Sequence, residues 1–453
     1  MAEITLRQAA QWCGGRVEEK YADIKFLGAN NDSRTIKPGQ LFLALRGERD
    51  GHDFIPMAME KGAAAVLCSR SCGDVPAIIV EDTRIALGLI AKHECARIGM
   101  KVVGVTGSVG KSTTKEMISC VLEESFRVAK TPANHNNDIG MPMAILSMPE
   151  DTQVAVLEMG MNHFREIAYL SDIAKPDVAV IINVGTAHIE YLGSREGILQ
   201  AKMEILEGLK PGGKAILNGD DDMLWSRRNN APVKPEYFGC ENTGCRIRGE
   251  EIVMGGGMLH FRVVTENRNF PVELNVEGRH YVLDALSAVS VGLAFGVAPE
   301  QICKRLAGFR NMAGRQEIFE KNGFTIIKDC YNAGPESMAA ALEVLGSKTG
   351  RRVAVLGDML ELGPRTQAEH YRVGRIAAEK ADLVLTYGPN GSRVISGAIT
   401  GGMPDTKAMA FEDREKLVAA LRRMAKPGDV ILFKGSRGMR MELILEAFLN
   451  KET

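Results

Sequence analysis

The segment that most constrains the fold of this chain runs from residue 102 to residue 124. Val102-Val-Gly-Val-Thr is an apolar, β-branched run typical of a buried strand, and residues 111–124 have the spacing of a helix. Between them lies the glycine-rich turn Thr106-Gly-Ser-Val-Gly-Lys-Ser-Thr-Thr. A turn of this kind between a buried strand and a helix is the arrangement of a phosphate-binding loop. It predicts an α/β fold in which helices cover both faces of a mostly parallel sheet.

The residue types in this turn predict nucleotide binding. Glycines let the backbone curl so that successive N–H groups point at phosphate oxygens. Lys111 can neutralise the β- and γ-phosphates, and the Ser112 hydroxyl can bind Mg²⁺. The general pattern places a glycine where this chain has Val105, and the alternative interpretation is an ordinary glycine-containing helix start. The residues expected to contact the phosphates are Gly107, Ser108, Val109, Gly110, Lys111, Ser112 and Thr113.

Length and strand pattern predict three domains. A chain of 453 residues is too long for one compact core. Short strands and turns precede residue 83, whereas after it strands and helices alternate until a Gly-, Asn- and Val-rich stretch at 235–278. That stretch contains a predicted antiparallel hairpin at 252–264, and the alternation restarts after Arg315. The expected domains are a small α/β domain (1–82), a central phosphate-loop domain with an antiparallel insertion (83–314) and a Rossmann-like α/β domain (315–453).

The predicted strands can be placed along the last two domains. In the central domain they follow residue 102 at 154–158, 178–184 and 215–218. In the C-terminal domain they lie at 325–328, 353–356, 383–386 and 430–434.

Charge and cysteine content exclude several classes of protein. Lys and Arg number 56 against 57 Asp and Glu, so no net field attracts nucleic acid or an anionic membrane. The nine cysteines form no C-x-x-C pair and read as reduced thiols, which favours the cytoplasm. The N-terminus lacks the apolar core of a signal peptide, and the most apolar helical run, 281–295, is too short to span a bilayer.

Polar side chains follow the strands expected beside the phosphate loop, where ligand groups of a parallel sheet gather. Glu158 ends one strand and is either a Mg²⁺ carboxylate or a strand-end glutamate. His188 follows the next strand, and a lone histidine of this kind is more often structural than a ligand. The segment Asn134-His-Asn-Asn-Asp-Ile-Gly reads as a turn with a helix cap, or as a group that orients phosphate or Mg²⁺-bound water.

Lys202 has two interpretations. It lies on a predicted helix whose apolar residues Ile198, Leu199 and Ile205 mark a buried face. The simpler interpretation is a solvated helix lysine. The alternative is that CO₂ adds to the amine, which converts a cation into a carbamate anion able to bind Mg²⁺.

Taken in order, these motifs resemble the Mur ligase family of peptidoglycan synthesis. The matching features are the loop T-G-S-V-G-K-S, the segment N-x-N-N-x-I-G, Glu158, His188 and Lys202 within Ala-Lys-Met-Glu, and they extend over essentially the whole chain. Tyr331-Asn-Ala-Gly-Pro-Glu-Ser, Leu356-Gly-Asp-Met-Leu-Glu-Leu-Gly and Lys434-Gly-Ser-Arg resemble the branch that adds D-alanyl-D-alanine to UDP-N-acetylmuramoyl-tripeptide. The D-N-P-R motif of the diaminopimelate-adding branch is absent.

The resemblance implies a monomeric three-domain ligase that forms an amide bond through an acyl phosphate and produces ADP and phosphate. It implies that ATP binds to the central domain with two Mg²⁺ ions, one on Ser112 and Glu158. The second ion is implied on Glu158, His188 and carbamoylated Lys202. The implied catalytic residues are Lys111, Lys202, His188 and Glu158.

The remaining implied contacts are distributed over all three domains. The UDP end of the substrate is implied on Ser33, Arg34, Arg46 and Gly47 of the first domain. Asn136 and Asn137 are implied near the phosphates, Arg315 at the interdomain hinge, and Asp329, Tyr331 and Asn332 near the nucleotide. The family's H-N-x-x-N-A reads His280-Tyr-Val-Leu-Asp284-Ala, so Asp284 stands where an adenine contact is implied.

Two other functions fit part of the sequence. A folylpolyglutamate synthetase shares the central and C-terminal domains but lacks the Asp32-Ser-Arg and Asp50-Gly-His-Asp-Phe segments found here. A nucleotide switch or binding module would hydrolyse ATP or GTP and would have no need of the C-terminal motifs.

Overall fold

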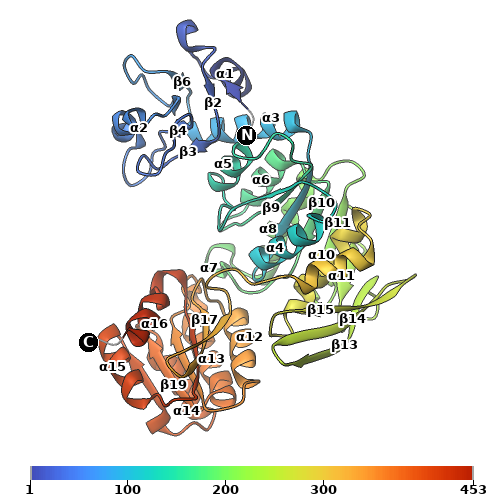
Figure 1. Cartoon of the computed structure of the whole chain (residues 1–453), viewed down its shortest axis with the longest axis vertical. Helices are drawn as coiled ribbons and strands as arrows, with labels where there is room; N and C mark the ends of the chain where they lie inside the picture. Colours follow the sequence, from blue (N-terminus) through green and yellow to red (C-terminus); the bar gives the residue numbers. More distant parts are fainter. Residues whose placement is uncertain (1–2, 451–453) are drawn as a thin grey trace.

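The computed structural model describes residues 3–450, which form three α/β domains arranged in a row (Figure 1). The sheets of the N-terminal, central and C-terminal domains have four, nine and six strands. The α/β class and the three-domain organisation expected from the sequence are confirmed. No helix within residues 3–450 is both long and apolar enough to cross a membrane.

The N-terminal domain is built on a parallel sheet in the order β3-β4-β5-β6, and a separate antiparallel pair joins β1 to β2. Gly14 ends helix α1 with a φ of +68°, a left-handed conformation that glycine adopts without steric cost. The elements are β1 Ile4–Thr5, α1 Leu6–Cys13, β2 Lys25–Phe26, β3 Ala29–Asn30, β4 Leu41–Leu43, α2 Ile55–Glu60, β5 Ala65–Cys68 and β6 Ala77–Ile79, with 3₁₀ turns at Glu19–Tyr21 and Gly51–Phe54.

Helix α3 (Thr83–Ile98) connects the first two domains. The Asp82 carboxylate caps it by accepting hydrogen bonds from the backbone N–H groups of Arg84 (2.7 Å) and Ile85 (3.1 Å). The helix packs against α1 of the N-terminal domain and against α5 and α6 of the central domain.

The central domain has the strand order β15-β14-β13-β12-β11-β10-β7-β9-β8. The strands from β8 to β13 pair in parallel, and β14 and β15 add an antiparallel edge. The strands are β7 Lys101–Thr106, β8 Val128–Lys130, β9 Val154–Glu158, β10 Val178–Ile181, β11 Lys214–Asn218, β12 Glu236–Gly239, β13 Ile247–Gly255, β14 Met258–Val264 and β15 Asn269–Leu274.

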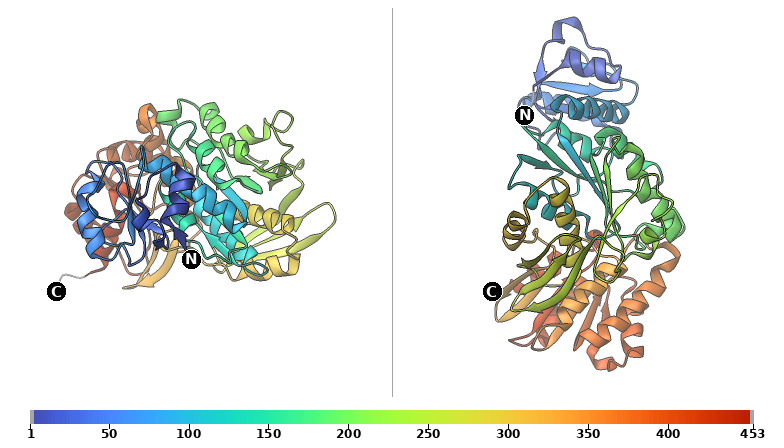
Figure 2. Two further views of the ribbon diagram at one scale, coloured as in Figure 1. Left: turned by 90° about the horizontal axis from the view of Figure 1, so that it is seen from above. Right: turned by 90° about the vertical axis from the view of Figure 1, so that its right-hand side faces the viewer.

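Helices cover both faces of the central sheet (Figure 2). In β7, Val102 faces the core that includes α5, α6 and α8, whereas Val103 and Val105 face the core that includes α4, α10 and α11. The strand therefore carries apolar side chains on both of its faces. The helices are α4 Lys111–Leu122, α5 Gly140–Leu146, α6 Glu166–Ala174, α7 Ile189–Leu192, α8 Arg195–Met203, α9 Asp222–Trp225, α10 Tyr281–Ala294 and α11 Pro299–Ala307, with a 3₁₀ turn at Glu204–Gly208.

The C-terminal domain has the strand order β16-β17-β21-β18-β19-β20, so β21 lies between strands that precede it by many residues. All neighbouring strands pair in parallel except β16 with β17. The elements are β16 Glu317–Lys321, β17 Phe324–Asp329, α12 Pro335–Gly346, β18 Arg352–Gly357, α13 Thr366–Lys380, β19 Leu383–Tyr387, α14 Gly391–Thr400, β20 Ala408–Phe411, α15 Arg414–Met424, β21 Val430–Lys434 and α16 Met441–Leu449, with 3₁₀ turns at Gly363–Arg365, Asp405–Lys407 and Arg437–Met439.

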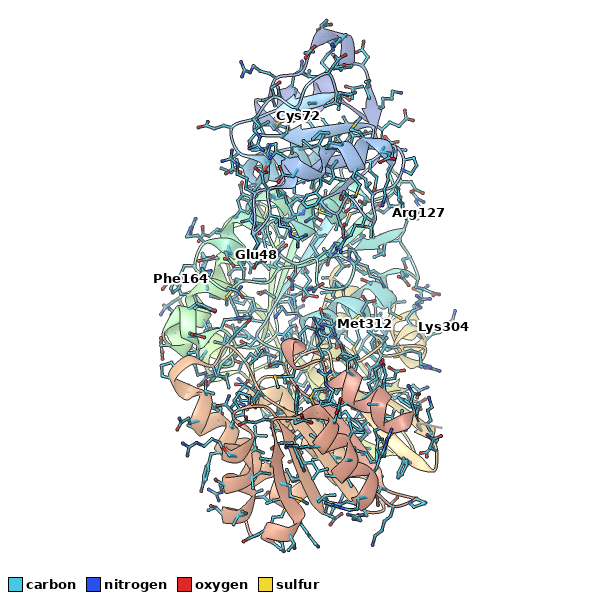
Figure 3. All side chains as sticks on the ribbon, turned by 90° about the vertical axis from the view of Figure 1, so that its left-hand side faces the viewer. Glu48, Cys72, Arg127, Phe164, Lys304 and Met312 are labelled. Carbon is cyan, nitrogen blue, oxygen red and sulfur yellow. The ribbon has the colours of Figure 1, made fainter. Side chains whose placement is uncertain are left out.

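The structure refines several expected elements. The strand expected over 178–184 ends at Ile181, and the helix expected around 197–209 changes to a 3₁₀ turn after Met203. The antiparallel insertion has a third strand, β15, beyond the predicted hairpin. The chain then passes from the central to the C-terminal domain near Met312 (Figure 3).

Candidate functional site

The predicted phosphate loop joins β7 to α4. Gly110 precedes α4 with a φ of +85°, a left-handed conformation that favours glycine at this turn. The loop curls around the amine of Lys111, which donates hydrogen bonds to the carbonyl oxygens of Gly107 (2.9 Å) and Ser108 (3.4 Å). Burial lowers the pKa of Lys111, Glu158 opposes this effect and Arg315 adds to it. A cation held inside a ring of backbone groups is suited to phosphate binding.

Ser112, in the first turn of α4, lies beside Glu158, which ends β9. The Ser112 hydroxyl donates to Oε2 of Glu158 at 2.7 Å, and the Asn136 amide donates to Oε1 at 2.8 Å. Arg315 reaches across from the C-terminal side and donates to the Ser112 hydroxyl at 2.9 Å. Hydroxyl and carboxylate oxygens are the hard ligands that Mg²⁺ prefers, so this pair fits a divalent cation.

A Mg²⁺ ion bound at this pair would need oxygen ligands in addition to the protein carboxylate. Within residues 3–450 no three His, Cys, Asp or Glu side chains cluster in a way that could hold a metal ion by themselves. Mg²⁺ commonly keeps water and binds substrate phosphates in addition to one or two carboxylates. The arrangement of Ser112 beside Glu158 matches that mode.

Lys202 is buried on α8, with a relative exposure of 2 %. Burial lowers its pKa well below the ordinary value, the nearby Lys111 lowers it further, and Asp221 opposes the shift. The interpretation as a solvated surface lysine is therefore wrong. Burial therefore favours the neutral form of the amine, which is the form that reacts with CO₂.

His188 faces the C-terminal domain. Its Nδ1 lies 3.0 Å from Oε2 of Glu361, and its backbone has a φ of +62°. A left-handed conformation is uncommon for a residue other than glycine and is a form of strain found at functional sites. In the described chain the ring makes no hydrogen bond to Ser112 or Glu158, so the structure does not join His188 to the other predicted metal ligands.

The predicted C-terminal nucleotide residues lie at the end of β17. The guanidinium of Arg315 stacks over the Tyr331 ring, 4.1 Å from its centroid. The buried Lys434 amine donates to Oδ2 of Asp329 (2.6 Å) and to the carbonyl of Asn332 (3.0 Å). These contacts fix the position of residues 329–332. Through the stacking of Tyr331, they also position Arg315, which contacts the phosphate loop side.

The two adjacent asparagines of the predicted polar segment have different surroundings. Asn136 reaches Glu158, as described above. Asn137 instead accepts a hydrogen bond from the backbone N–H of Gly140 at 2.7 Å, where α5 begins. The two interpretations of this segment, helix cap and phosphate-site residue, therefore apply to different residues of it.

The four predicted UDP-binding residues lie in loops of the N-terminal domain. The Ser33 hydroxyl contacts the Met57 sulfur at 3.3 Å, and Arg34 pairs with Asp32 at 2.8 Å. Arg46 forms an isolated bridge with Asp50, and the Gly47 N–H donates to Arg49 (3.3 Å). None of the four contacts the phosphate loop.

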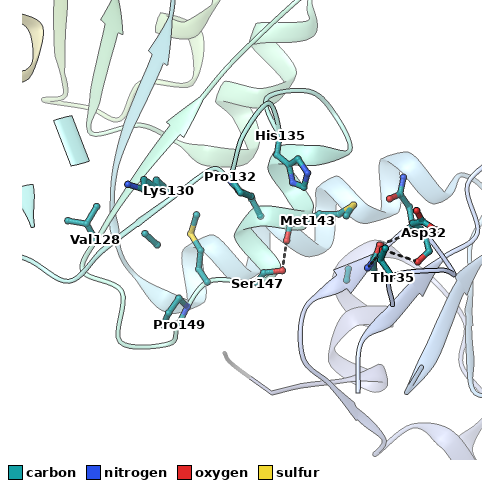
Figure 4. Close-up of a pocket in the computed structure, with 15 residues that line it drawn as sticks. Asp32, Thr35, Val128, Lys130, Pro132, His135, Met143, Ser147 and Pro149 are labelled. Carbon is teal, nitrogen blue, oxygen red and sulfur yellow. Dashed lines mark hydrogen bonds between the residues drawn. The ribbon is translucent and has the colours of Figure 1, made fainter. Parts of the chain in front are cut away.

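A cavity of about 660 Å³ separates these loops from the central domain (Figure 4). Asp32 and Thr35, which flank Ser33 and Arg34, line one wall. Lys130 and His135 of the central domain line the opposite part. The predicted substrate residues thus border a large interdomain space without lining it themselves.

Three family models match the chain, one for each domain. They are the Mur ligase family catalytic domain (residues 23–94), the Mur ligase middle domain (105–292) and the Mur ligase, glutamate ligase domain (314–437). The chain belongs to the Mur ligase family.

Individual Mur ligases match over their full length. The UDP-N-acetylmuramoyl-tripeptide–D-alanyl-D-alanine ligase of Bacillus subtilis is 40% identical, with 98% of each chain covered. MurF from Acinetobacter baumannii has a TM-score of 0.91 at 34% identity and full coverage of both chains. MurF ligase from Thermotoga maritima, in complex with ADP, has a TM-score of 0.83 at 32% identity, covering 93% of this chain and 97% of its own.

The folylpolyglutamate synthetase alternative has weaker support. The Mycobacterium tuberculosis folylpolyglutamate synthase is 15% identical, with a TM-score of 0.64 over 81% of this chain and 94% of its own. This likeness concerns the fold alone.

Sequence reasoning missed a residue that shapes the phosphate loop of this Mur ligase. Asn183, just after β10, accepts hydrogen bonds through Oδ1 from the backbone N–H groups of Ser108 (2.9 Å) and Val109 (3.0 Å). A polar side chain immediately after a buried strand was the available signal. Glu336 and Glu361, which reach the central domain at Thr186 and His188, carried no such signal because their contacts depend on domain packing.

Asp284 lies under the phosphate loop of this Mur ligase. Its Oδ1 accepts a hydrogen bond from the Thr114 hydroxyl at 2.8 Å. A Cβ at Gly110 would meet the same oxygen at 2.7 Å, so the carboxyl group abuts the loop backbone. Burial raises the pKa of Asp284 to about 7, against the effects of the Thr114 hydrogen bond and Arg315.

We expect Asp284→Asn to stabilise this Mur ligase at alkaline pH. Because the folded-state pKa is raised from 3.8 to about 7, the stability that the acid contributes is full below pH ~4 and is lost as the pH rises towards 7. Asparagine keeps an oxygen for Thr114 but has no proton to lose. Thermal unfolding should show a higher Tm for the variant at about pH 8 and a smaller difference at about pH 5. Equal Tm values at pH 8 would contradict the assignment.

Proposed function

We propose that this Mur ligase joins D-alanyl-D-alanine to UDP-N-acetylmuramoyl-tripeptide with ATP, in the assembly of peptidoglycan precursors. The full-length match to a ligase of that name is the observation that carries the proposal. The phosphate loop with Lys111, and the Ser112–Glu158 pair beside it, support phosphoryl transfer from ATP. The ADP complex of a full-length structural relative supports nucleotide binding.

The proposed reaction has two steps. An oxygen of the tripeptide's terminal carboxylate bonds to the γ-phosphorus, and the bond from that phosphorus to ADP breaks. The dipeptide nitrogen then bonds to the acyl carbon, loses a proton, and phosphate leaves with the electrons of its bond to that carbon. Both steps crowd anionic oxygens together, so the enzyme's main task is alignment and charge neutralisation.

Individual residues can be given parts in this reaction. Lys111 would hold the β- and γ-phosphates in line, and Asn183, which accepts hydrogen bonds from the Ser108 and Val109 N–H groups, would fix the shape of the loop around them. Arg315, stacked on Tyr331, adds a second cation beside Ser112. Mg²⁺ ions, when bound, would neutralise phosphate charge; Ser112, Glu158, His188 and carbamoylated Lys202 are the residues proposed to hold two of them.

Domain packing would protect the acyl phosphate from water. Glu336 of α12 accepts hydrogen bonds from the Thr186 N–H (3.0 Å) and hydroxyl (2.9 Å), close to the phosphate loop. Together with Arg315 and Glu361, this contact ties the C-terminal domain to the central one. A closed interface of this kind excludes water from reactive intermediates.

The cytoplasm and a monomeric state belong to the same proposal. All nine cysteines are free thiols, which suits a reducing compartment. Light scattering of the purified protein tests the monomer, and limited proteolysis near residues 82 and 314 tests the proposed domain boundaries.

We expect steady-state release of ADP and phosphate only when both peptide substrates are present. The expectation follows from Lys111, whose position serves the β- and γ-phosphates rather than the α-phosphate. ADP, AMP and phosphate should be measured with UDP-N-acetylmuramoyl-tripeptide alone, with D-alanyl-D-alanine alone and with both. A folate substrate with glutamate serves as the control for the alternative ligase. Stoichiometric AMP, or turnover with the folate pair, would contradict the proposal.

A further inference from the structure

We propose that Lys115, a second buried lysine on α4, is a positioning residue that acts through Thr131 to hold Glu158 in place for Mg²⁺. The inference rests on the proposed function, because it gives Lys115 a part in the metal and nucleotide site of that reaction. Lys115 lies one helical turn beyond Lys111 and has a relative exposure of 0 %. Its amine binds Thr131 and not the phosphate loop, so any effect on the reaction must pass through another residue.

The Lys115 amine is held by two acceptors. It donates a hydrogen bond to the Thr131 carbonyl oxygen at 2.6 Å, and it lies 3.2 Å from Oε1 of Glu116. Glu116 also pairs with Lys130 at 2.6 Å, so α4 is fastened to the end of β8 at two adjacent points. An apolar residue of similar size is often as stable as a buried ion pair. The retention of a lysine here therefore points to a purpose other than stability.

Thr131 joins this lysine to the backbone of Glu158. It follows β8 directly and is fully buried. Its hydroxyl oxygen accepts a hydrogen bond from the Glu158 N–H at 3.0 Å, and its own N–H donates to the Val156 carbonyl at 3.2 Å. Because the carbonyl that Lys115 binds and the hydroxyl that binds Glu158 belong to one residue, loss of the lysine contact frees both to shift.

The segment that begins at Thr131 reaches Glu158 a second time. The Asn136 amide of this segment donates to Oε1 of the Glu158 carboxylate at 2.8 Å. The other carboxylate oxygen, Oε2, accepts the hydrogen bond from Ser112 at 2.7 Å. Helix α4 thus carries Ser112 itself and, in the next turn, the lysine that fixes the segment around its carboxylate partner.

The identity of the ion makes this positioning matter. Mg²⁺ demands near-ideal octahedral geometry, with oxygen ligands at about 2.0–2.1 Å, so a displaced carboxylate binds it poorly. Removing an outer contact that orients a metal ligand typically costs about 10- to 100-fold in metal affinity or activity. Loss of the Lys115 contact should therefore weaken Mg²⁺ binding at Glu158, while the phosphate loop that holds the nucleotide stays intact.

The test measures how much Mg²⁺ tightens nucleotide binding, which requires neither peptide substrate. The full chain is titrated by calorimetry with the non-hydrolysable analogue β,γ-imido-ATP, once with MgCl₂ and once with EDTA. We expect Lys115→Met to reduce the gain in affinity from Mg²⁺ at least about fivefold, while the affinity in EDTA stays within about twofold of wild type. Thr131→Val should reduce the gain similarly. The double variant should lose no more than the weaker single variant, because both substitutions break one path.

Ser119→Ala is the matched control. Ser119 is also fully buried on α4, and its hydroxyl donates to the Lys115 backbone carbonyl at 2.8 Å, not to β8. This variant should keep the gain from Mg²⁺ within about twofold.

Three results would overturn the inference. The first is an unchanged gain in Lys115→Met, and the second is an equal loss of affinity with MgCl₂ and with EDTA, since either leaves Lys115 as a support of the helix alone. The third is an unchanged gain in Thr131→Val, which decides the matter if Lys115→Met does not fold. A wild type that gains affinity with Mg²⁺ but makes no product from the two peptide substrates would instead reject the proposed function.

Discussion

Replacing Lys111 with alanine is expected to lower kcat about a thousandfold or more. The Lys111 amine lies in the hollow of the phosphate loop, held by the carbonyl oxygens of Gly107 and Ser108. A charge aimed at a transferring phosphoryl group stabilises the transition state more than the bound substrate, so its loss appears mainly in kcat. Coupled ADP-release kinetics with both peptide substrates would measure the effect.

Two controls make this result specific to the loop. Lys101→Ala removes a lysine at the start of β7, the strand that leads into the phosphate loop. Its side chain is exposed and pairs with Asp177 at 3.0 Å. We expect it to change kcat less than about twofold, since surface ion pairs contribute little. Affinity of Lys111→Ala for the UDP substrate, measured by titration calorimetry, should remain close to wild type. A matching loss of that affinity would show that the domain assignment is wrong.

Replacing Lys202 is expected to abolish most activity while leaving the fold intact. The side chain is buried and its pKa is lowered well below the ordinary value by burial and by Lys111. Because the folded protein disfavours the protonated amine, a neutral residue of similar length costs no stability near neutral pH. Lys202→Met should therefore keep or raise Tm, yet lower kcat at least about a hundredfold if a carbamate supplies charge to the metal site.

Further measurements separate a carbamate from a bare amine. Lys202→Glu restores an anionic oxygen on a shorter side chain and should recover part of the lost activity. Trapping the carbamate by O-methylation, followed by mass spectrometry of the tryptic peptide, should reveal added mass on Lys202. Full activity in Lys202→Met would leave this lysine with no part in the reaction.

Much of the phosphate site could be predicted because its signals are local in sequence. The glycines and Lys111 follow one buried strand directly, and Glu158 ends the neighbouring strand, so parallel pairing alone places them at one edge. Asn183 was missed because its contacts to Ser108 and Val109 join residues about 75 positions apart. Its role depends on β10 pairing beside β7, an order that apolar runs do not encode.

Contacts between domains were beyond sequence reasoning for a related reason. Arg315 reaches Ser112, and Glu361 reaches His188, only because the C-terminal domain packs in one particular orientation. The motif around Leu356 was evident, but which of its side chains faces the central domain depends on the left-handed turn at Glu361. Burial of Lys202 likewise depends on which face of α8 packs on the sheet. The apolar residues of this helix are compatible with more than one buried face, so the sequence does not decide it.

The position of β21 has a consequence for the order in which the C-terminal domain folds during synthesis. Its neighbours β17 and β18 are made long before it, and the Asp329–Lys434 pair that joins β17 to β21 spans 105 residues. Until β21 emerges from the ribosome, β17 and β18 lack the strand that lies between them. Their apolar side chains then stay exposed and can bind chaperones. Because β21 must pair with strands far away in the sequence, the sheet of this domain is expected to form more slowly than its helices. Nascent chains stalled before residue 430 are therefore expected to remain protease-sensitive in this domain alone.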